Sequence, residues 1–468
     1  MPEPSDDSPD LVTRAWAWPA SRWLLLLGIP FGVAFALVTP PLQTPDELRH
    51  LGRAFAVSEG TLAAQTVVDG EPCIEVPRSL LALPARLGKG LQLHSERRQD
   101  PGRIARELAR SPALEPRAPQ PLPSLYSPLA YVPQAAGVGL ARALGLPVVA
   151  YVYAGRLANL AAFLALTALA LRAAPAHRTT LLLVALLPMT LFLASSLSAD
   201  AATNALAFAW LGLAFRAATP GSPLGARAWG ALALVAAALG LAKPGYVPLV
   251  ALVLAVPASR FESRGRRALA LAGCAAAALV PGLLWSAYVA RLAPEPLIDG
   301  ADPAAQLRWI AENPGGFAAV LLGSLADARR LWTATFVGVL GHADTWLPRW
   351  LYTLYPLVLV AVGVADGGAR SPLRGAARRA LALAAAASCA LGALVLGYVL
   401  WNEVGSRWIQ GFQGRYFTPA VPLALAALHA PRARELAGAP RLAALAFAAV
   451  ALALSLGRLW ARYYGPPA

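Results

Sequence analysis

The sequence predicts an all-α fold, a polytopic bundle of about eleven membrane-spanning helices. Hydrophobic residues make up 57% of the 468 positions and charged residues only 14%, which leaves too little polar surface for a soluble protein of this length. Apolar stretches of about 20 residues, long enough to cross a bilayer, recur along the chain. Clusters of arginine lie between them, a pattern typical of multi-pass membrane proteins.

The first apolar stretch, from about Trp23 to Val38, is followed by a polar loop without a small-residue cleavage pattern. Because more spans follow, we interpret it as a retained anchor and not as a signal peptide. Residues 1–21 would then form a cytoplasmic tail, and residues 22–468 a single transmembrane domain. The expected spans cover residues 22–40, 148–172, 179–197, 200–216, 227–242, 245–259, 267–290, 349–365, 380–400, 415–430 and 441–458.

Arginine content divides the connections between these spans into two classes. Connections rich in arginine belong on the cytoplasmic side. Their arginines are Arg172, Arg178, Arg216, Arg227, Arg260, Arg264, Arg266, Arg267, Arg370, Arg374, Arg378, Arg379, Arg432 and Arg434. The other connections would lie outside, and two of them are long outer loops, residues 41–147 and 291–348.

The first outer loop contains two segments that we interpret as lying along the membrane. The alternation of loops holds only if residues 127–145 do not cross, and Pro128, Pro133 and the modest length of this segment indicate a juxtamembrane or re-entrant helix. Residues 79–93 are rich in leucine and amphipathic, which is typical of a helix in the membrane interface.

The net charge of +15 indicates contact with anionic lipid head groups, because the arginines cluster between hydrophobic spans. We therefore expect a lipid bilayer as a partner and no nucleic acid. Cys73, Cys274 and Cys389 are too dispersed for a disulfide framework or a zinc site. The expected location is the cell membrane, with the N-terminus in the cytoplasm.

A run of charged residues, Thr44 to Arg53, directly follows the first span. Charged side chains are costly at membrane depth, so their concentration at the mouth of a bundle suggests chemistry there. Thr44 as N-cap, Pro45 at the first helical position and Glu47 at the third would form a capping box, which gives Glu47 a structural role. Asp46 is not needed for that box, so it is the stronger catalytic candidate of the acidic pair Asp46 and Glu47.

Helical spacing would divide the continuation of this run into two faces. Asp46, His50 and Arg53 share one face, which would meet the bundle cleft or water. Leu48, Leu51 and Phe55 form the other face, which would meet lipid. Arg53 has an alternative role as a contact to a lipid phosphate.

A second carboxylate, Asp200, lies at the expected outer end of a later span. Ser198 can cap the helix that begins here, and Asn204 lies one turn beyond Asp200 on the same face. Two acids facing one cleft can act as a general base and its orienting group, or they can share a divalent cation, Mg²⁺ or Mn²⁺. The sequence leaves both alternatives open, with Asp46 and Asp200 as the possible metal ligands.

Basic residues at the outer ends of other spans complete the candidate site. Lys243, Arg407 and Arg415 would bind phosphate, Arg through bidentate hydrogen bonds and Lys as a point charge. The alternative is that they extend to the membrane interface. Arg156 and Asn159, inside the second span, have either a buried pairing role or a ligand role. The candidate substrate-binding residues are thus His50, Arg53, Tyr126, Asn204, Lys243, Arg407, Arg415 and Tyr416.

Several of these residues lie in motifs whose order resembles a known family. The motifs are Tyr126-Ser127-Pro128-Leu129-Ala130-Tyr131, Gly155-Arg156-Leu157-Ala158-Asn159, Leu187-Pro188-Met189-Thr190, Ser198-Ala199-Asp200, Lys243-Pro244 and Gly414-Arg415-Tyr416-Phe417. Together they resemble a bacterial family of multi-spanning membrane proteins of unknown function, found with surface-polysaccharide genes and similar to the glycosyltransferase C (GT-C) superfamily. The match extends over almost the whole chain, but no soluble C-terminal domain is evident.

The resemblance implies a GT-C-like fold and a function. In that superfamily an Asp of the first outer loop acts near the acceptor, a second acid assists it or a metal, and basic residues hold a polyprenyl-phosphate donor. These roles fall on Asp46, on Asp200, and on Lys243 with Arg415. We therefore expect an enzyme of cell-envelope polysaccharide biosynthesis that transfers a sugar from polyprenyl phosphate to a glycan or lipid acceptor. The alternatives are a transporter or flippase for a lipid-linked glycan, and a non-catalytic scaffold.

Overall fold

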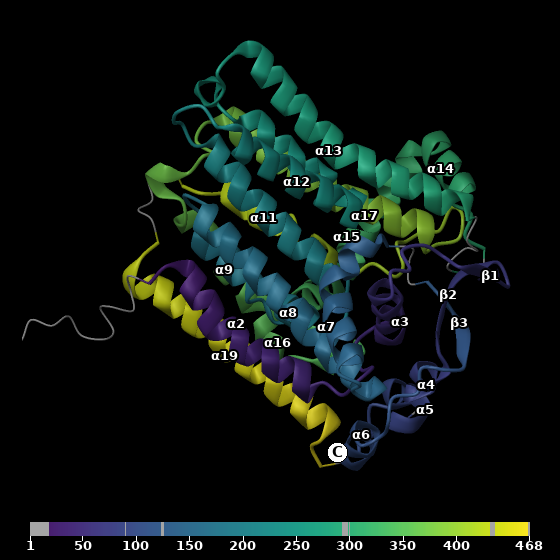
Figure 1. Ribbon diagram of the computed structural model, residues 1–468. Coiled ribbons are helices and arrows are strands. Elements are labelled where there is room, and N and C mark those ends of the chain that lie inside the picture. The colour runs from purple at the N-terminus through teal and green to yellow at the C-terminus, as the bar shows by residue number, and fades with distance from the viewer. Residues whose placement is uncertain are drawn as a thin grey trace, which may run out of the picture.

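The computed structural model describes residues 18–88, 90–122, 126–292, 298, 300–430 and 436–466. The chain is mostly helical, as predicted. Long helices lie side by side, and short helices and a small sheet gather at one end of them (Figure 1). Residues 1–17 of the expected cytoplasmic tail, and also Arg432 and Arg434, lie outside the described residues.

The first part of the chain consists of α2 (Ala20–Val38), α3 (Glu47–Ser58), β1 (Thr66–Val68), β2 (Glu71–Pro77), α4 (Arg78–Leu81), α5 (Leu83–Gly88), η1 (Leu91–Leu93), α6 (Pro101–Leu108), β3 (Arg117–Pro121), η2 (Pro128–Tyr131) and α7 (Val132–Ala143). The middle consists of α8 (Val148–Ala173), α9 (Arg178–Ala185), α10 (Pro188–Ala194), α11 (Asp200–Ala218), α12 (Ala226–Ala242), η3 (Pro244–Ala255), η4 (Ala258–Arg260) and α13 (Arg264–Arg291). The last part consists of α14 (Pro303–Glu312), α15 (Pro314–Val337), β4 (Val339–Leu340), β5 (Thr345–Trp346), α16 (Arg349–Ala365), η5 (Gly368–Arg370), α17 (Ala376–Leu400), η6 (Gly414–Phe417), α18 (Val421–Ala427) and α19 (Gly438–Tyr463).

Five helices of the described chain are long and apolar enough to cross a membrane: α2, α8, α13, α17 and α19. The helices α12, η3 and α16 are apolar but shorter. Two expected spans are not continuous helices. Residues 179–197 divide into α9 and α10 at Pro188, and residues 415–430 divide into η6 and α18. Proline has no backbone N–H and interrupts the helical hydrogen bonds, which accounts for the break at Pro188. The structure therefore does not confirm the count of eleven spans.

The two segments predicted to be long outer loops contain regular structure that the sequence analysis did not predict. Residues 314–337 form the 24-residue helix α15, which was missed because Asp327, Arg329 and Arg330 interrupt its apolar sequence. In the first loop, β1, β2 and β3 form an antiparallel sheet in that order. Leu80 and Leu83, from the segment expected in the membrane interface, are instead buried against this part of the protein.

The helix α7 agrees with the interpretation of residues 127–145 as a segment that does not cross. Its 12 residues span about 18 Å at 1.5 Å per residue, less than the roughly 30 Å of the hydrocarbon core. It packs against α3 and α8 and leaves Val132 and Leu140 exposed. This exposed apolar face suits a position along the membrane surface.

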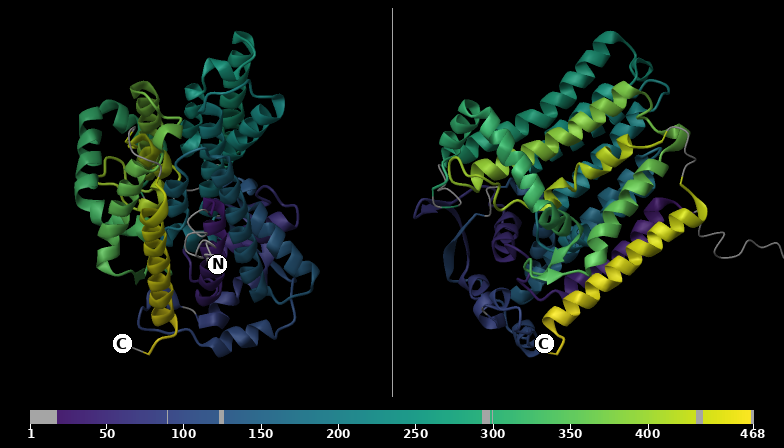
Figure 2. Two further views of the ribbon diagram at one scale, coloured as in Figure 1. Left: turned by 90° about the vertical axis from the view of Figure 1, so that its left-hand side faces the viewer. Right: turned by 180° about the vertical axis from the view of Figure 1, so that it is seen from behind.

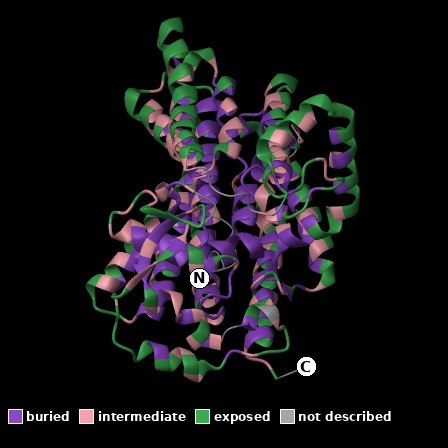
Figure 3. Cartoon of the chain, turned by 90° about the vertical axis from the view of Figure 1, so that its right-hand side faces the viewer, coloured by how far each residue is buried: buried purple, intermediate pink, exposed green. Residues whose placement is uncertain are grey.

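The outer faces of the bundle are apolar and exposed. Buried residues concentrate in the middle of the molecule, and exposed residues cover its periphery (Figure 3). Of the 28 residues of α13, only Cys274, Ala278 and Gly282 are buried, whereas leucines such as Leu269 and Leu284 are exposed. An exposed apolar helix of this length is expected to face lipid.

The arginine-rich connections meet at one end of the bundle, as the charge pattern predicts. The amide of Leu224 donates to the carbonyl of Arg260, and the hydroxyl and amide of Thr180 both donate to Asp366. The two predicted outer loops meet at the opposite end, which we call the loop end. There Arg462 contacts Asp344 and the carbonyl of Leu91. The helices α2 and α19 run in the same direction between these ends (Figure 2).

Candidate functional site

The helix α3 begins at Glu47, and Asp46 is its N-cap, with a φ of 59° in the left-handed region. The predicted capping box is therefore wrong. Thr44 precedes the N-cap, and its carbonyl accepts a hydrogen bond from the Glu47 amide at 3.3 Å. The box does not form because the Glu47 carboxylate, which would have to return to Thr44, is bound elsewhere.

The Glu47 carboxylate forms a fully buried ion pair with Arg156 of α8, both side chains being 0% exposed. Nε of Arg156 donates to Glu47 at 2.8 Å, and the guanidinium also donates to the carbonyls of Ala36, Thr39 and Pro40 at the end of α2. The second carboxylate oxygen of Glu47 accepts a hydrogen bond from the amide of Leu42 at 2.9 Å. Glu47 thus joins α2, α3 and α8, which favours the structural role that its place in the sequence indicated over a catalytic one.

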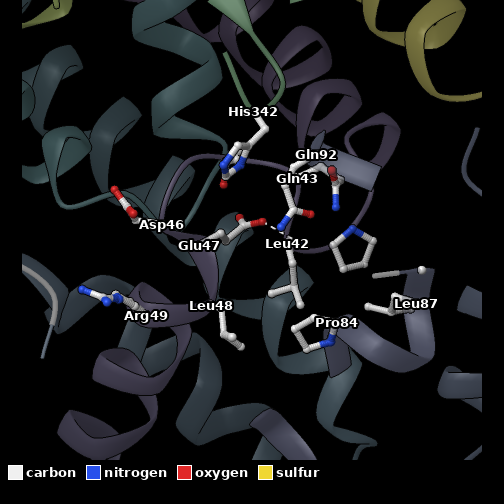
Figure 4. A pocket seen from close by; sticks show the side chains of 13 residues that line it. Leu42, Gln43, Asp46, Glu47, Leu48, Arg49, Pro84, Leu87, Gln92 and His342 are labelled. Carbon is white, nitrogen blue, oxygen red and sulfur yellow. Dashed lines mark hydrogen bonds between the residues drawn. The ribbon is translucent and has the colours of Figure 1, made fainter. Parts of the chain in front are cut away.

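The Asp46 carboxylate is exposed and lies on the other side of the chain from Glu47 (Figure 4). Two neighbouring cavities share Asp46 and Arg49 in their walls. A left-handed conformation is uncommon for residues other than glycine, although Asp and Asn tolerate it better than most. This backbone conformation therefore positions an unburied carboxylate at the junction of two cavities.

Asp200, Lys243 and Arg415 come together at the loop end of the bundle. Nζ of Lys243 lies 3.1 Å from Oδ1 of Asp200, and Nε of Arg415 lies 3.6 Å from Oδ2. Asp200 begins α11, Lys243 directly follows α12, and Arg415 lies in η6, so three separate elements contribute. The close approach of η6 to α15 requires Gly414, because a Cβ there would lie 1.7 Å from the carbonyl oxygen of Trp332.

Aromatic rings surround the Lys243 ammonium. It lies 5.4 Å from the ring centre of Tyr126, 5.9 Å from that of Tyr246 and 4.8 Å from that of Tyr416. Such contacts attract a cation through the ring quadrupole and hold it in place. Tyr126 and Tyr416, two of the residues expected from the sequence to bind a ligand, also line the cavity beside Asp200.

His50 lies on α3 at the edge of the same cavity. Its Nδ1 and the hydroxyl of the buried Tyr131 are hydrogen-bonded at 2.8 Å. Burial lowers the pKa of His50 below its ordinary value, although the carboxylates of Asp46 and Asp200 oppose this shift. A neutral imidazole can accept or donate a hydrogen bond near pH 7 without adding charge.

The cavity between these residues, which we call the basic cavity, has a volume of about 130 Å³. Asp46, Arg49, His50, Asp200 and Arg415 are among the residues that line it. The wall of the cavity and the neighbouring Lys243 together carry three cationic side chains, Arg49, Lys243 and Arg415, and two carboxylates. The net positive charge of the basic cavity suits an anionic group, and phosphate is the anion expected near a membrane surface.

Other residues proposed from the sequence lie outside the basic cavity. Arg53 is buried and donates to the carbonyl of Leu62 at 2.8 Å. Asn204 is buried within α11, and Arg407 is exposed in the segment that follows α17. The amide nitrogen of Asn159 donates to the carbonyl of Ser196 at 2.8 Å, which gives it the buried pairing role.

The second predicted face of α3 meets protein and not lipid. Leu51 and Phe55 are fully buried in a cluster with residues of α7 and α8, and Phe55 stacks on Tyr151. The sequence shows that these residues form an apolar face, but the same pattern suits lipid and protein partners.

Two residues of the basic cavity were not singled out from the sequence, Arg49 and Trp401. A signal existed for Arg49, because it lies three residues after Asp46 and so on the same helical face. No local pattern predicts Trp401, which comes from the distant end of α17.

A divalent cation bound by Asp46 and Asp200 stays a prediction. The two carboxylates line the same cavity, but both oxygens of Asp200 face Lys243 or Arg415. Over the described part of the chain, no group of three or more His, Cys, Asp or Glu side chains is arranged to hold a metal ion.

These features define a multi-pass helical membrane protein with a charged site at one end of its bundle. The chain belongs to the family described as "Predicted membrane protein (DUF2142)", whose model matches residues 29–424. This confirms the expected family of multi-spanning membrane proteins of unknown function, whereas the similarity to the GT-C superfamily stays a prediction. Neither the curated proteins nor the solved structures contain a match to the chain.

Proposed function

We propose that this protein is a membrane glycosyltransferase, which moves a sugar from a polyprenyl-phosphate donor to an acceptor hydroxyl at the outer face of the membrane. The observation that carries the proposal is the pairing of Lys243 and Arg415 around Asp200, beside the exposed carboxylate of Asp46. This arrangement offers a phosphate site and a base within the wall of one cavity.

The basic residues suit the phosphate of the donor. Nε of Arg415 is buried and, within the described residues, makes no hydrogen bond. Oδ2 of Asp200 lies 3.6 Å from it, beyond hydrogen-bond distance, so this N–H can donate to a phosphate oxygen. Arginine binds phosphate through a planar fork of N–H groups, and Lys243 adds a point charge. Asp200 holds both cations in place until a donor phosphate shares them.

The reaction follows from this arrangement. The acceptor hydroxyl would lose its proton to Asp46 while its oxygen forms a bond to the anomeric carbon of the donor sugar. The bond from that carbon to the phosphate oxygen breaks, and the electron pair leaves with polyprenyl phosphate. Lys243 and Arg415 stabilise the charge that develops on this leaving group.

Exposed tryptophans support a site at the depth of the lipid phosphates. Five exposed tryptophans lie at or near the loop end, in or next to β5, α16, α17 and α19: Trp346, Trp350, Trp401, Trp408 and Trp460. Tryptophan is enriched where a membrane meets water. Trp401 also lines the basic cavity, which supports a position of this cavity near the level of the lipid phosphates.

Donor binding tests the proposal. A charge-assisted hydrogen bond contributes about 1.5–3 kcal/mol, so we expect Arg415→Ala to weaken binding of a radiolabelled polyprenyl-phosphate sugar roughly 10- to 100-fold. Arg415→Lys should lose less, because the charge remains while the bidentate fork does not. The exposed Arg407 supplies the matched control, and Arg407→Ala should bind as wild type does.

Equal donor binding by wild type and by the Arg415→Ala, Lys243→Ala double variant would contradict the phosphate site. Transfer of the labelled sugar to an added acceptor separates catalysis from translocation. Movement of intact donor across a vesicle membrane without transfer would favour a flippase instead.

A further inference from the structure

A second cavity, of about 230 Å³, lies on the other side of Asp46 (Figure 4). The segment that connects α2 to α3 forms one wall, and α5 with the segment around η1 forms another. His342, from the turn between β4 and β5, closes it from the second outer loop. We call it the polar cavity.

Three residues that line the polar cavity each carry a buried polar atom that makes no hydrogen bond within the described residues: Oε1 of Gln43, Oγ1 of Thr44 and Nδ1 of His342. Gln43 is 6% exposed and Thr44 2% exposed. Buried polar groups are nearly always hydrogen-bonded, so unpaired ones that line one cavity indicate a partner that binds there.

The charges around the polar cavity favour a neutral ligand. The Glu47 carboxylate is neutralised by its buried pair with Arg156. Arg49 and Asp46, the other charged residues in the wall, have opposite signs and are exposed. A ligand that offers several hydroxyl groups but no net charge therefore fits the unpaired acceptors and donors better than an anion does.

We propose that the polar cavity binds a neutral carbohydrate group, the sugar unit of the acceptor, with one hydroxyl directed at Asp46. The volume is below the roughly 300–1,000 Å³ typical of sites for drug-sized ligands, which limits the occupant to one or two sugar rings. This inference rests on the proposed function for the role of the ligand as acceptor. The binding of a neutral sugar rests on the polar cavity alone.

Saturation-transfer NMR on the full-length protein in lipid nanodiscs tests the binding. The probes are methyl α-glucoside, lactose and, as an anionic comparison, methyl glucuronoside. We expect signals from the neutral sugars to exceed those from the anionic one. Thr44→Val with Gln43→Leu should weaken neutral-sugar binding about tenfold, since two hydrogen bonds are lost.

A matched control separates ligand binding from general effects of removing a buried hydroxyl. Oγ1 of Thr167 in α8 is also buried and unpaired in the described chain, but Thr167 does not line the polar cavity. Thr167→Val should bind the sugars as wild type does. If the Gln43 and Thr44 double variant fails to fold, His342→Phe tests the cavity from a different element and should weaken binding as well.

Two readouts distinguish the failure of this inference from the failure of the proposed function. Absence of neutral-sugar binding, or equal binding by wild type, the double variant and His342→Phe, overturns the polar cavity as a carbohydrate site even if donor binding depends on Arg415. A different result separates the two. If sugar binding requires Thr44 and Gln43 but donor binding does not depend on Arg415, the carbohydrate site is supported and the proposed transferase function is contradicted.

Discussion

Asp46 and Glu47 are adjacent acids with different tasks. Glu47 is buried in an ion pair, whereas Asp46 is exposed between the basic and polar cavities. Composition and spacing indicate that one acid is structural and the other free. They could not identify Arg156 as the partner of Glu47, because 109 positions separate the two residues and only the packing of α8 against α3 brings them together.

We predict that Asp46→Asn lowers the rate of sugar transfer by about 100-fold or more, while the protein still folds. Loss of a general base typically costs 10²- to 10⁴-fold in rate, and Asn tolerates the left-handed backbone as well as Asp does. Transfer rate and apparent melting temperature are the measurements. Asp69, also left-handed but in the turn between β1 and β2, gives the control Asp69→Asn. A normal rate of sugar transfer by Asp46→Asn would contradict the assignment of Asp46 as the general base.

The lowered pKa of His50 predicts a pH dependence of stability. Burial disfavours the imidazolium in the folded protein, so the unfolded state binds a proton more readily. His50 thus stabilises the fold at a pH above its ordinary pKa of about 6.5, and this contribution is lost as the pH falls toward the lowered value. The wild-type melting temperature should drop more between about pH 7.5 and pH 5.5 than that of His50→Gln. Parallel curves for the two proteins would contradict this assignment.

At the scale of elements, long apolar helices were predictable and interrupted ones were not. The helices α2, α8, α13, α17 and α19 lie where the expected spans were, because about 20 apolar residues in sequence are a strong signal. The segments that position the site are different. Asp46, Lys243 and Arg415 lie in or next to turns or 3₁₀ helices, whose geometry depends on packing against distant elements such as α15.

The Glu47–Arg156 ion pair joins the end of α2 to the start of α3, so we expect its loss to destabilise the fold. Glu47→Gln leaves a buried arginine without its counter-charge, and removal of one partner of such a pair typically costs about 3–5 kcal/mol. We expect a much lower melting temperature and weaker donor binding. Glu262→Gln, which breaks the exposed pair with Arg266, should change stability by less than about 0.5 kcal/mol. A similar effect of both variants would contradict the structural role of Glu47.

At the scale of the whole molecule, charge distribution and fold agree on two distinct ends. The loop end combines the first of the predicted outer loops, the turn at His342 and the end of α19, and both cavities lie there. Arginine content alone could predict which connections share a side. It could not predict that residues 291–348 contribute His342 to the wall of a cavity formed mainly by residues 41–92, because that contact depends on tertiary packing.

This division predicts the topology. Ser95 and Ser222 are exposed serines at opposite ends, Ser95 at the loop end and Ser222 among the arginine-rich connections. Ser95→Cys should react with a membrane-impermeant maleimide on intact cells, and Ser222→Cys only after permeabilisation, because arginine-rich loops stay in the cytoplasm. The native cysteines give little background, since all three are buried and burial raises the pKa of the Cys73 thiol. Labelling of Ser222→Cys but not of Ser95→Cys on intact cells would show that the protein has the opposite orientation in the membrane. Asp46 and the basic cavity would then face the cytoplasm, and a donor on the outer leaflet could not reach them.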